Sequence, residues 1–300
     1  MRGIIAGFAL LLAALSGRVG ACTLSLQGGI PVYALVYDSF SPTPARLSAV
    51  IQIKNEGSKP CDAAIAFFSQ AGKASSGSHS ISYSVSGAAG GDLINAGASA
   101  SSDVKAGKFL PLAQLAPREN RSVTFELTAS PGQIVPPETY VDDLQIVVYE
   151  SRGGSPIGRI SALQRQVRIA AKPVVSVNLA GGGQTTALDF GILSTGATRA
   201  AQLQARSNIR FSLVAMSENG GALKLDPPAT DGGSWQAPYT VRINGGADLT
   251  LSANKKVELG VAATSLEGIA VPVEVRIGGV DGQRAGHYRD VITVQIAADP

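Results

Sequence analysis

Residues 286–300 read GHYRDVITVQIAADP. In this stretch Ile292, Val294 and Ile296 alternate with Thr293 and Gln295. Apolar side chains at every second position predict a β-strand with one face buried in a core. Few residues follow this strand, so we expect one of its two edges to lack a neighbouring strand from the same chain.

A similar stretch, TYVDDLQIVVY, occupies residues 139–149. Its tyrosine, aspartate and apolar positions recur in order, with Tyr140, Asp142, Leu144, Ile146 and Val148 matching Tyr288, Asp290, Ile292, Val294 and Ile296. The earlier stretch is followed by residues 163–170, in which Val167 and Ile169 are apolar at alternate positions. We therefore expect the earlier copy to have a closing strand that the later copy lacks.

The two Tyr-x-Asp pairs have a structural interpretation. Tyr140 and Tyr288 are placed like corner tyrosines, which pack under a turn and hydrogen-bond to the backbone. Asp142 and Asp290 are expected to accept hydrogen bonds from loop amides. We propose no catalytic role for either pair.

Length and composition predict two all-β domains. The chain has 300 residues with Gly 35 and Pro 16, which favours strands and turns over helices. Short strands follow one another with no helical pattern between them, which indicates two tandem β-sandwiches. Lys172-Pro173 marks the boundary, so we expect domains at 22–170 and 171–300. The second domain begins with three alternating apolar residues, Val175, Val177 and Leu179.

The N-terminus has the pattern of a secretory signal peptide at residues 1–21. Arg2 precedes an apolar stretch at 4–15 that is too short to span a bilayer. Small residues at Val19-Gly20-Ala21 predict cleavage after Ala21. We therefore expect an exported protein, with a short membrane anchor as the competing interpretation.

The chain has two cysteines, Cys22 and Cys61. In an oxidising compartment they are expected to form one disulfide, worth about 4 kcal/mol in the chain-entropy model. The alternative is a lipid anchor on Cys22, because Val19-Gly20-Ala21-Cys22 weakly resembles a lipobox and a lipidated cysteine does not pair. Arg18 counts against lipidation, since a lipobox normally adjoins the apolar region directly.

Charge and motif content exclude several classes of function. Without Arg2 and Arg18, 23 basic residues face 22 acidic ones, and no basic run suggests nucleic acid. The two histidines, His79 and His287, do not supply a metal site or a catalytic triad. No nucleotide, zinc or hydrolase motif occurs. We expect no enzyme activity and no cofactor.

Short motifs in each domain resemble those of a known family. The first domain has Cys22 at its expected start, YDSFSP at 37–42, Cys61, and PPETYVDDL at 136–144. This pattern is similar to the spore coat protein U domain, found in secreted pilus subunits of archaic chaperone–usher systems. The second domain, with LDFG at 188–191 and GHYRD at 286–290, resembles a diverged copy without cysteines. The glycine that usually precedes the tyrosine is Thr139 in the first copy.

This resemblance implies immunoglobulin-like, pilin-type sandwiches, with a last strand supplied by another protein. The implied partners are a periplasmic pilus chaperone, an outer-membrane usher and a neighbouring pilin subunit. The implied location is the periplasm in transit and then a fimbrium on the cell surface.

We combine these points into one hypothesis, a two-domain tip subunit of a surface fibre. The first domain would face outward as an adhesin for an unknown surface ligand, because Cys22 as first mature residue leaves no donor segment ahead of it. The Gly- and Ser-rich residues 69–108 either only tolerate insertion or carry recognition. An acceptor groove in the second domain would have two walls, Ile292, Val294 and Ile296 facing Val175, Val177 and Leu179.

Two rival interpretations stay open. One is a secreted or lipid-anchored two-domain binding protein that does not polymerise. The other is a two-domain periplasmic chaperone, which would require a basic cleft and long exposed apolar strands that the first domain does not clearly have.

Overall fold

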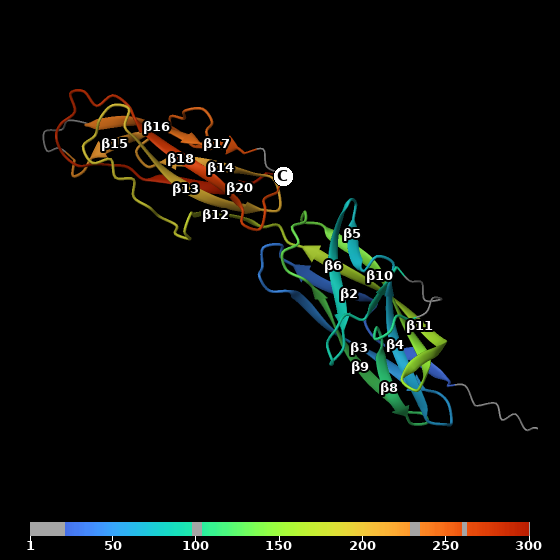
Figure 1. Ribbon diagram of the computed structural model, residues 1–300. Coiled ribbons are helices and arrows are strands. Elements are labelled where there is room, and N and C mark those ends of the chain that lie inside the picture. Colours follow the sequence, from blue (N-terminus) through green and yellow to red (C-terminus); the bar gives the residue numbers. More distant parts are fainter. Residues whose placement is uncertain (1–21, 98–103, 229–234, 260–262, 300) are drawn as a thin grey trace, which may run out of the picture.

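The computed structural model describes residues 22–97, 104–228, 235–259 and 263–299. These residues form twenty strands and no helix, which confirms the predicted all-β class. The strands fall into two sets that lie end to end in Figure 1. None of the described residues lies in a helix of the length and hydropathy needed to cross a bilayer. The predicted signal peptide falls outside the described residues.

The first set packs as a sandwich whose two layers join through the β5–β6 hairpin. Its strands are β1 (Leu24–Gln27), β2 (Val32–Tyr37), β3 (Ala45–Asn55), β4 (Cys61–Ser69), β5 (Lys73–Ser76), β6 (His79–Ser86), β7 (Ile94–Ala96), β8 (Leu110–Leu115), β9 (Asn120–Ala129), β10 (Thr139–Arg152) and β11 (Ser155–Ala171). One layer runs β1-β3-β9-β6, and the other contains β4, β10, β11 and β2. Alternating apolar residues of both layers fill the core, with Phe67 and Phe125 in ring contact at 4.9 Å.

The closing strand β11 completes this sandwich. It pairs antiparallel with β10 along its length and parallel with β2 over residues 166–171. Val167 and Ile169 of β11 are fully buried, as the alternation in the sequence predicts.

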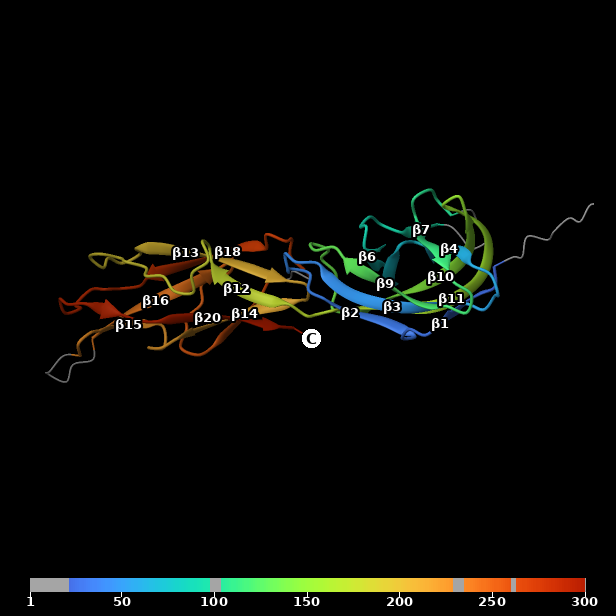
Figure 2. The same cartoon turned by 90° about the horizontal axis from the view of Figure 1, so that it is seen from below.

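The second set forms two separate sheets around a smaller core. Its strands are β12 (Val175–Leu179), β13 (Thr198–Ser207), β14 (Phe211–Ser217), β15 (Ala222–Leu225), β16 (Gln236–Ile243), β17 (Lys255–Glu258), β18 (Ile269–Ile277), β19 (Tyr288–Arg289) and β20 (Ile292–Ala298). One sheet has the order β12-β13-β18-β16-β15-β19, and the other has the order β17-β14-β20. Figure 2 shows these sheets as two layers.

The two sets meet at a short connection. Strand pairing changes from one set to the other between Ala171 and Val175, next to the boundary that the sequence predicts. The buried Asn208 follows β13 and donates from Nδ2 to the carbonyl oxygens of Val135 (3.1 Å) and Lys172 (2.8 Å). Its Oδ1 accepts from Val174 N at 2.8 Å. One amide side chain of the second set therefore binds both the first set and the connection.

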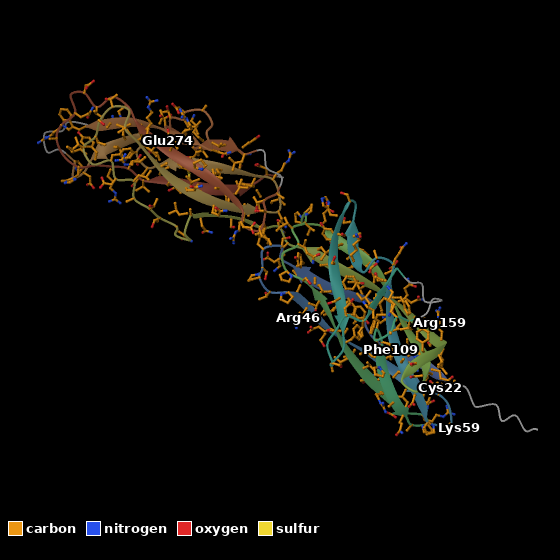
Figure 3. All side chains as sticks on the ribbon, in the orientation of Figure 1. Cys22, Arg46, Lys59, Phe109, Arg159 and Glu274 are labelled. Atoms are coloured by element: carbon orange, nitrogen blue, oxygen red, sulfur yellow. A yellow bond between two sulfur atoms is a disulfide. The ribbon has the colours of Figure 1, made fainter. Side chains whose placement is uncertain are left out.

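The predicted disulfide is present. Cys22 and Cys61 are bonded, with their Cα atoms 5.8 Å apart. Figure 3 places Cys22 and Lys59 at the end of the first sandwich that lies away from the second. The bond ties the segment before β1 to the start of β4, so both layers are linked there.

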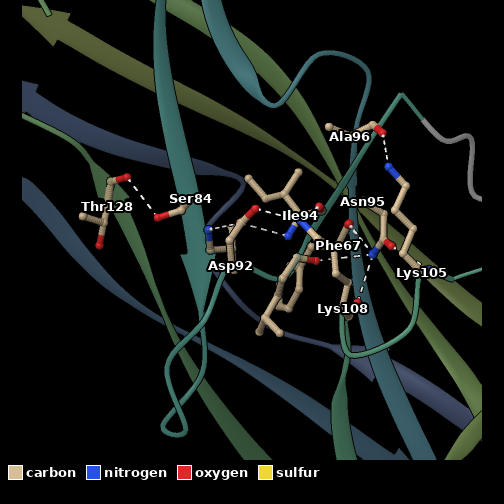
Figure 4. A network of polar contacts seen from close by, with 11 residues as sticks. Phe67, Ser84, Asp92, Ile94, Asn95, Ala96, Lys105, Lys108 and Thr128 are labelled. Carbon is tan, nitrogen blue, oxygen red and sulfur yellow. Dashed lines mark hydrogen bonds and ion pairs between the residues drawn. The ribbon is translucent and has the colours of Figure 1, made fainter.

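The described part of the Gly- and Ser-rich region, residues 69–97 and 104–108, contains regular strands. β5 and β6 form a hairpin, and Ile81, Tyr83 and Val85 of β6 are buried in the core. Asn95 is fully buried and donates from Nδ2 to the carbonyl oxygens of Phe67 (3.2 Å) and Lys108 (3.0 Å), as Figure 4 shows. Asn95 therefore links the segment that ends at residue 97 and the segment that begins at residue 104 to strand β4.

Candidate functional site

A polar cluster occurs once in each sandwich, around the aspartate of the Tyr-x-Asp repeat. In the first sandwich Asp142 Oδ2 accepts from Ser69 Oγ (2.5 Å) and Tyr83 Oη (2.7 Å). In the second sandwich Asp290 Oδ2 accepts from Ser217 Oγ (2.5 Å) and from Tyr239 Oη (2.5 Å). The aspartates therefore bind two hydroxyls each, which the sequence analysis did not foresee.

The turn contacts of the cluster are also repeated. Ser69 Oγ accepts from Gly72 N at 2.8 Å, and Ser217 Oγ accepts from Gly221 N at 2.7 Å. Asp290 Oδ1 also accepts from the loop amides of Asn219 (3.0 Å) and Val291 (2.7 Å), as the sequence predicts for this residue. Each cluster joins the end of a strand to the turn that follows it.

The two tyrosines of the repeat are corner tyrosines, as the sequence analysis predicts. Tyr140 Oη donates to the carbonyl oxygen of Pro136 at 2.9 Å, four residues upstream. Tyr288 Oη donates to the carbonyl oxygen of Arg284 at 2.8 Å, again four residues upstream. Both hydroxyls therefore have structural partners in the backbone.

Burial governs the ionisation of the tyrosines that reach the aspartates. Burial raises the pKa of Tyr83 and of Tyr239, and the hydrogen bonds to Asp142 and Asp290 raise both pKa values further. Burial also raises the pKa of Tyr140 to about 12. These hydroxyls stay protonated at neutral pH and serve as hydrogen-bond donors.

The strands beside the clusters pair in the same register in both sandwiches. In the first, Ile146 of β10 is opposite Phe67 of β4. In the second, Val294 of β20 is opposite Ala215 of β14. Both partners are displaced by the same 148 residues, so β14 and β20 occupy the places of β4 and β10.

The two sandwiches differ at the other edge of this strand pair. β10 carries β11 along its second edge. No described strand pairs with the second edge of β20, which makes it an edge strand of its sheet. The consequence is visible in burial: Leu144, Ile146 and Val148 are fully buried, whereas Ile292, Val294 and Ile296 are partly exposed.

The other predicted wall lies on β12, which is the edge of the facing sheet. Val175, Val177 and Leu179 are partly exposed and pack against the same core as Ile292, Val294 and Ile296. Cα atoms of β12 and β20 come within 8 Å of each other, and no described strand lies between these two edges. The structure thus brings the six residues close together, on the edge strands β12 and β20 of the two sheets.

The sequence analysis missed a segment of the second sandwich that corresponds to β2 of the first. In the first sandwich β2 ends at Tyr37, and Asp38 Oδ1 then accepts from Phe40 N at 2.9 Å. In the second, Asp189 Oδ1 accepts from Gly191 N at 2.8 Å. This matched turn makes residues 183–188 the counterpart of β2, yet they form no strand and only Leu188 among them is partly buried. The LDFG motif at 188–191 was the available signal.

The open edge of β20 has none of the usual protection against pairing. Exposed strand edges are normally blocked by proline, by charged side chains or by bulges. β8, at an edge of the first sandwich, contains Pro111, and β17, at the far side of the β20 sheet, contains Lys255, Lys256 and Glu258. β20 reads ITVQIAA and contains neither proline nor charge.

Comparison with known proteins gives likenesses of fold. No protein-family model and no curated protein matches the chain. The structure resembles a chain of the CsuC–CsuE chaperone–tip adhesion subunit pre-assembly complex from archaic chaperone–usher Csu pili of Acinetobacter baumannii. The TM-score is 0.47 at 12% identity, over 92% of this chain and 99% of that chain.

It also resembles CfaE, the adhesive subunit of CFA/I fimbria of enterotoxigenic Escherichia coli. The TM-score is 0.36 at 10% identity, over 89% of this chain and 92% of that chain. A chain of the chaperone–tip adhesin complex of CFA/I fimbriae gives a TM-score of 0.39 at 9% identity, over 89% and 96% of the two chains. All three TM-scores lie below 0.5, so the function of this chain has to be inferred from its own residues.

Proposed function

We propose that this protein is an exported subunit of a chaperone–usher surface fibre, and that its second sandwich accepts a strand from another protein. The observation that carries the proposal is the missing neighbour of β20, at the place where the first sandwich has β11. A peptide that adds to an open sheet edge gains backbone hydrogen bonds and buries alternate side chains. The partly exposed residues on β20 and β12 are the apolar surface that such a strand would cover.

The partners follow from this mode of assembly. A periplasmic chaperone would occupy the open edge first, an outer-membrane usher would export the subunit, and a neighbouring pilin would supply the permanent strand. The protein would pass through the periplasm and end on the cell surface.

The place of the subunit in the fibre follows from the contrast between the sandwiches. The first sandwich has β11 in its own gap and cannot accept a strand there. We therefore place the first domain (22–170) outward, at the tip, as an adhesin domain for a surface ligand. The second domain (171–300) would connect it to the next subunit.

The test gives the chain its own missing strand. Residues 153–171 are appended directly after Pro300, because position 300 corresponds to position 152 under the 148-residue displacement. We expect the extended chain, lacking residues 1–21, to be a soluble monomer with a thermal midpoint raised by on the order of 10 °C. A scrambled segment of the same composition is the matched control and should leave the midpoint unchanged.

One result would overturn the proposal. If the unextended chain is monomeric, unfolds cooperatively and gains nothing from the appended segment, the second sandwich needs no partner. The rival interpretation, a two-domain secreted or lipid-anchored binding protein that does not polymerise, would then stand.

A further inference from the structure

The first sandwich contains a template for the strand that the second one lacks. β10 and β11 pair so that Tyr140 is opposite Ile169 and Asp142 is opposite Val167. Further along β10, Leu144 is opposite Arg165 and Ile146 is opposite Leu163. Since β20 keeps the register of β10 relative to its other neighbour, the same pairing can be transferred to Tyr288, Asp290, Ile292 and Val294.

Burial along β11 is unequal. Val167 and Ile169 are fully buried and Ala171 is 8% exposed, whereas Leu163 and Arg165 are only partly buried. The deeply held part of β11 is the part that also pairs with β2. A closing strand in this fold is therefore anchored at the corner-tyrosine end, not along the middle of the neighbouring strand.

The same end of the second sandwich is the one left unfinished. Residues 183–188, the counterpart of β2, form no strand. The carbonyl oxygen of Gly183 accepts from Leu179 N at 2.8 Å, and the segment then leads into the Asp189 turn. Leu188 and Phe190 are only partly buried against the core of the second sandwich. In the first sandwich, Tyr37, which is the counterpart of Leu188, is 1% exposed. At this end, the side chains of Leu188 and Phe190 could be buried further by a partner strand. The backbone of residues 184–188 belongs to no strand, so its N–H and C=O groups could pair with that partner.

Resting on the proposed function, we infer that the partner strand holds its two anchoring side chains opposite Tyr288 and Asp290, and that residues 183–188 become a strand along its other edge. The anchoring side chains are aliphatic, like Ile169 and Val167. The position opposite Ile292 tolerates a long polar side chain, as β11 has Arg165 at the matching place.

An aspartate scan of the appended segment tests where the anchors lie. Four variants of the extended chain are made, each with one substitution in the appended segment and none in the original β11. In the numbering of β11, the substitutions are Val167→Asp, Ile169→Asp, Arg165→Asp and Leu163→Asp. We expect the first two changes to abolish the gain in thermal midpoint, because each places a carboxylate in a fully buried position. The Arg165→Asp copy should keep most of the gain, and the Leu163→Asp copy should keep an intermediate part.

Hydrogen exchange tests the second half of the inference. Amides of residues 184–188 should exchange at least about tenfold more slowly in the extended chain than in the unextended one, because they become paired. The amides of Gly181 and Gly182, which lie outside the β2 counterpart, serve as the internal control.

The outcomes separate the inference from the proposed function. If the appended segment raises the midpoint but the Leu163→Asp copy is the most damaging, or if residues 184–188 gain no protection, the inference is wrong while strand acceptance stands. If the intact appended segment does not raise the thermal midpoint, both the proposed function and this inference are wrong.

Discussion

At the scale of single residues, the repeated Ser–Asp–Tyr clusters hold the strand ends that flank the opening. The sequence predicts the corner tyrosines correctly, because a hydroxyl four residues after a turn is a local arrangement. It does not predict the bonds from Tyr83 to Asp142 and from Tyr239 to Asp290, whose partners lie 59 and 51 residues apart. Periodicity describes faces of strands but not which distant strand ends meet.

The hydroxyl of Tyr239 should matter more than that of Tyr288. Tyr239→Phe removes a hydrogen bond from a buried tyrosine to a partly buried aspartate, and should lower the free energy of unfolding by about 1–3 kcal/mol. Tyr288→Phe removes an exposed bond to a carbonyl and should cost under about 0.5 kcal/mol. Urea denaturation of the two variants makes the comparison, and equal losses would show that the cluster around Asp290 adds nothing special.

Stability should fall at alkaline pH. The folded-state pKa values of Tyr83, Tyr239 and Tyr140 lie above the unfolded value near 10. Their contribution is therefore fully present below about pH 10 and is lost as the pH rises through the folded-state values. Urea denaturation at pH 8 and pH 11 should give a lower free energy of unfolding at pH 11. The variant Tyr83→Phe/Tyr239→Phe should show a smaller drop, and an unchanged drop would rule out these hydroxyls as its source.

At the scale of elements, the alternation of β20 and β12 was readable from the sequence, but most pairing was not. β2 pairs with β11, which lies more than a hundred residues later in the chain, and no local pattern encodes such a partner. The segment 183–188 was missed because its residues, GQTTAL, lack the apolar alternation of β2. The open edge of β20 was predictable only through comparison with the earlier copy.

Ile146 of β10 and Val294 of β20 are matching positions of the repeat, and an aspartate should destabilise the protein much more at the first than at the second. Ile146→Asp buries a charge in a fully enclosed core and should cost more than about 4 kcal/mol, enough to unfold the first sandwich. Val294→Asp, at a partly exposed position, should cost about 1–2 kcal/mol in the unextended chain.

The measurement is chemical denaturation of each variant, with Thr293→Asp as the control on the outer face of β20. In the extended chain, Val294→Asp should remove the benefit of the appended strand, whereas Thr293→Asp should not. If Val294→Asp unfolds the second sandwich even without the extension, β20 is already enclosed and the opening does not exist.

At the scale of the whole molecule, Asn208 connects the two sandwiches. Its side chain makes three hydrogen bonds, to Val135, Lys172 and Val174, and it is 2% exposed. The sequence predicts a boundary at Lys172-Pro173 from its composition, but nothing in the sequence marks this asparagine as part of the connection.

Removing that side chain should separate the unfolding of the two halves. Asn208→Ala leaves one buried and two partly buried backbone groups without this partner, and should lower the free energy of unfolding by about 2–3 kcal/mol. Differential scanning calorimetry of the extended chain should then resolve two transitions in place of overlapping ones. The exposed Asn178→Ala is the control. A single, equally shifted transition would mean that Asn208 only stabilises its own sandwich.

The spacing of the two polar clusters bears on the ancestry of the chain. Ser69 and Asp142 are 73 residues apart, and so are Ser217 and Asp290. Equal spacing with the same contacts is what a tandem duplication leaves behind. Of the two copies, only the first has a described strand, β11, along the second edge of its repeat strand. Under the proposed function, a duplicated domain that once closed its own sheet would have become one that depends on a partner, without the need for any new surface.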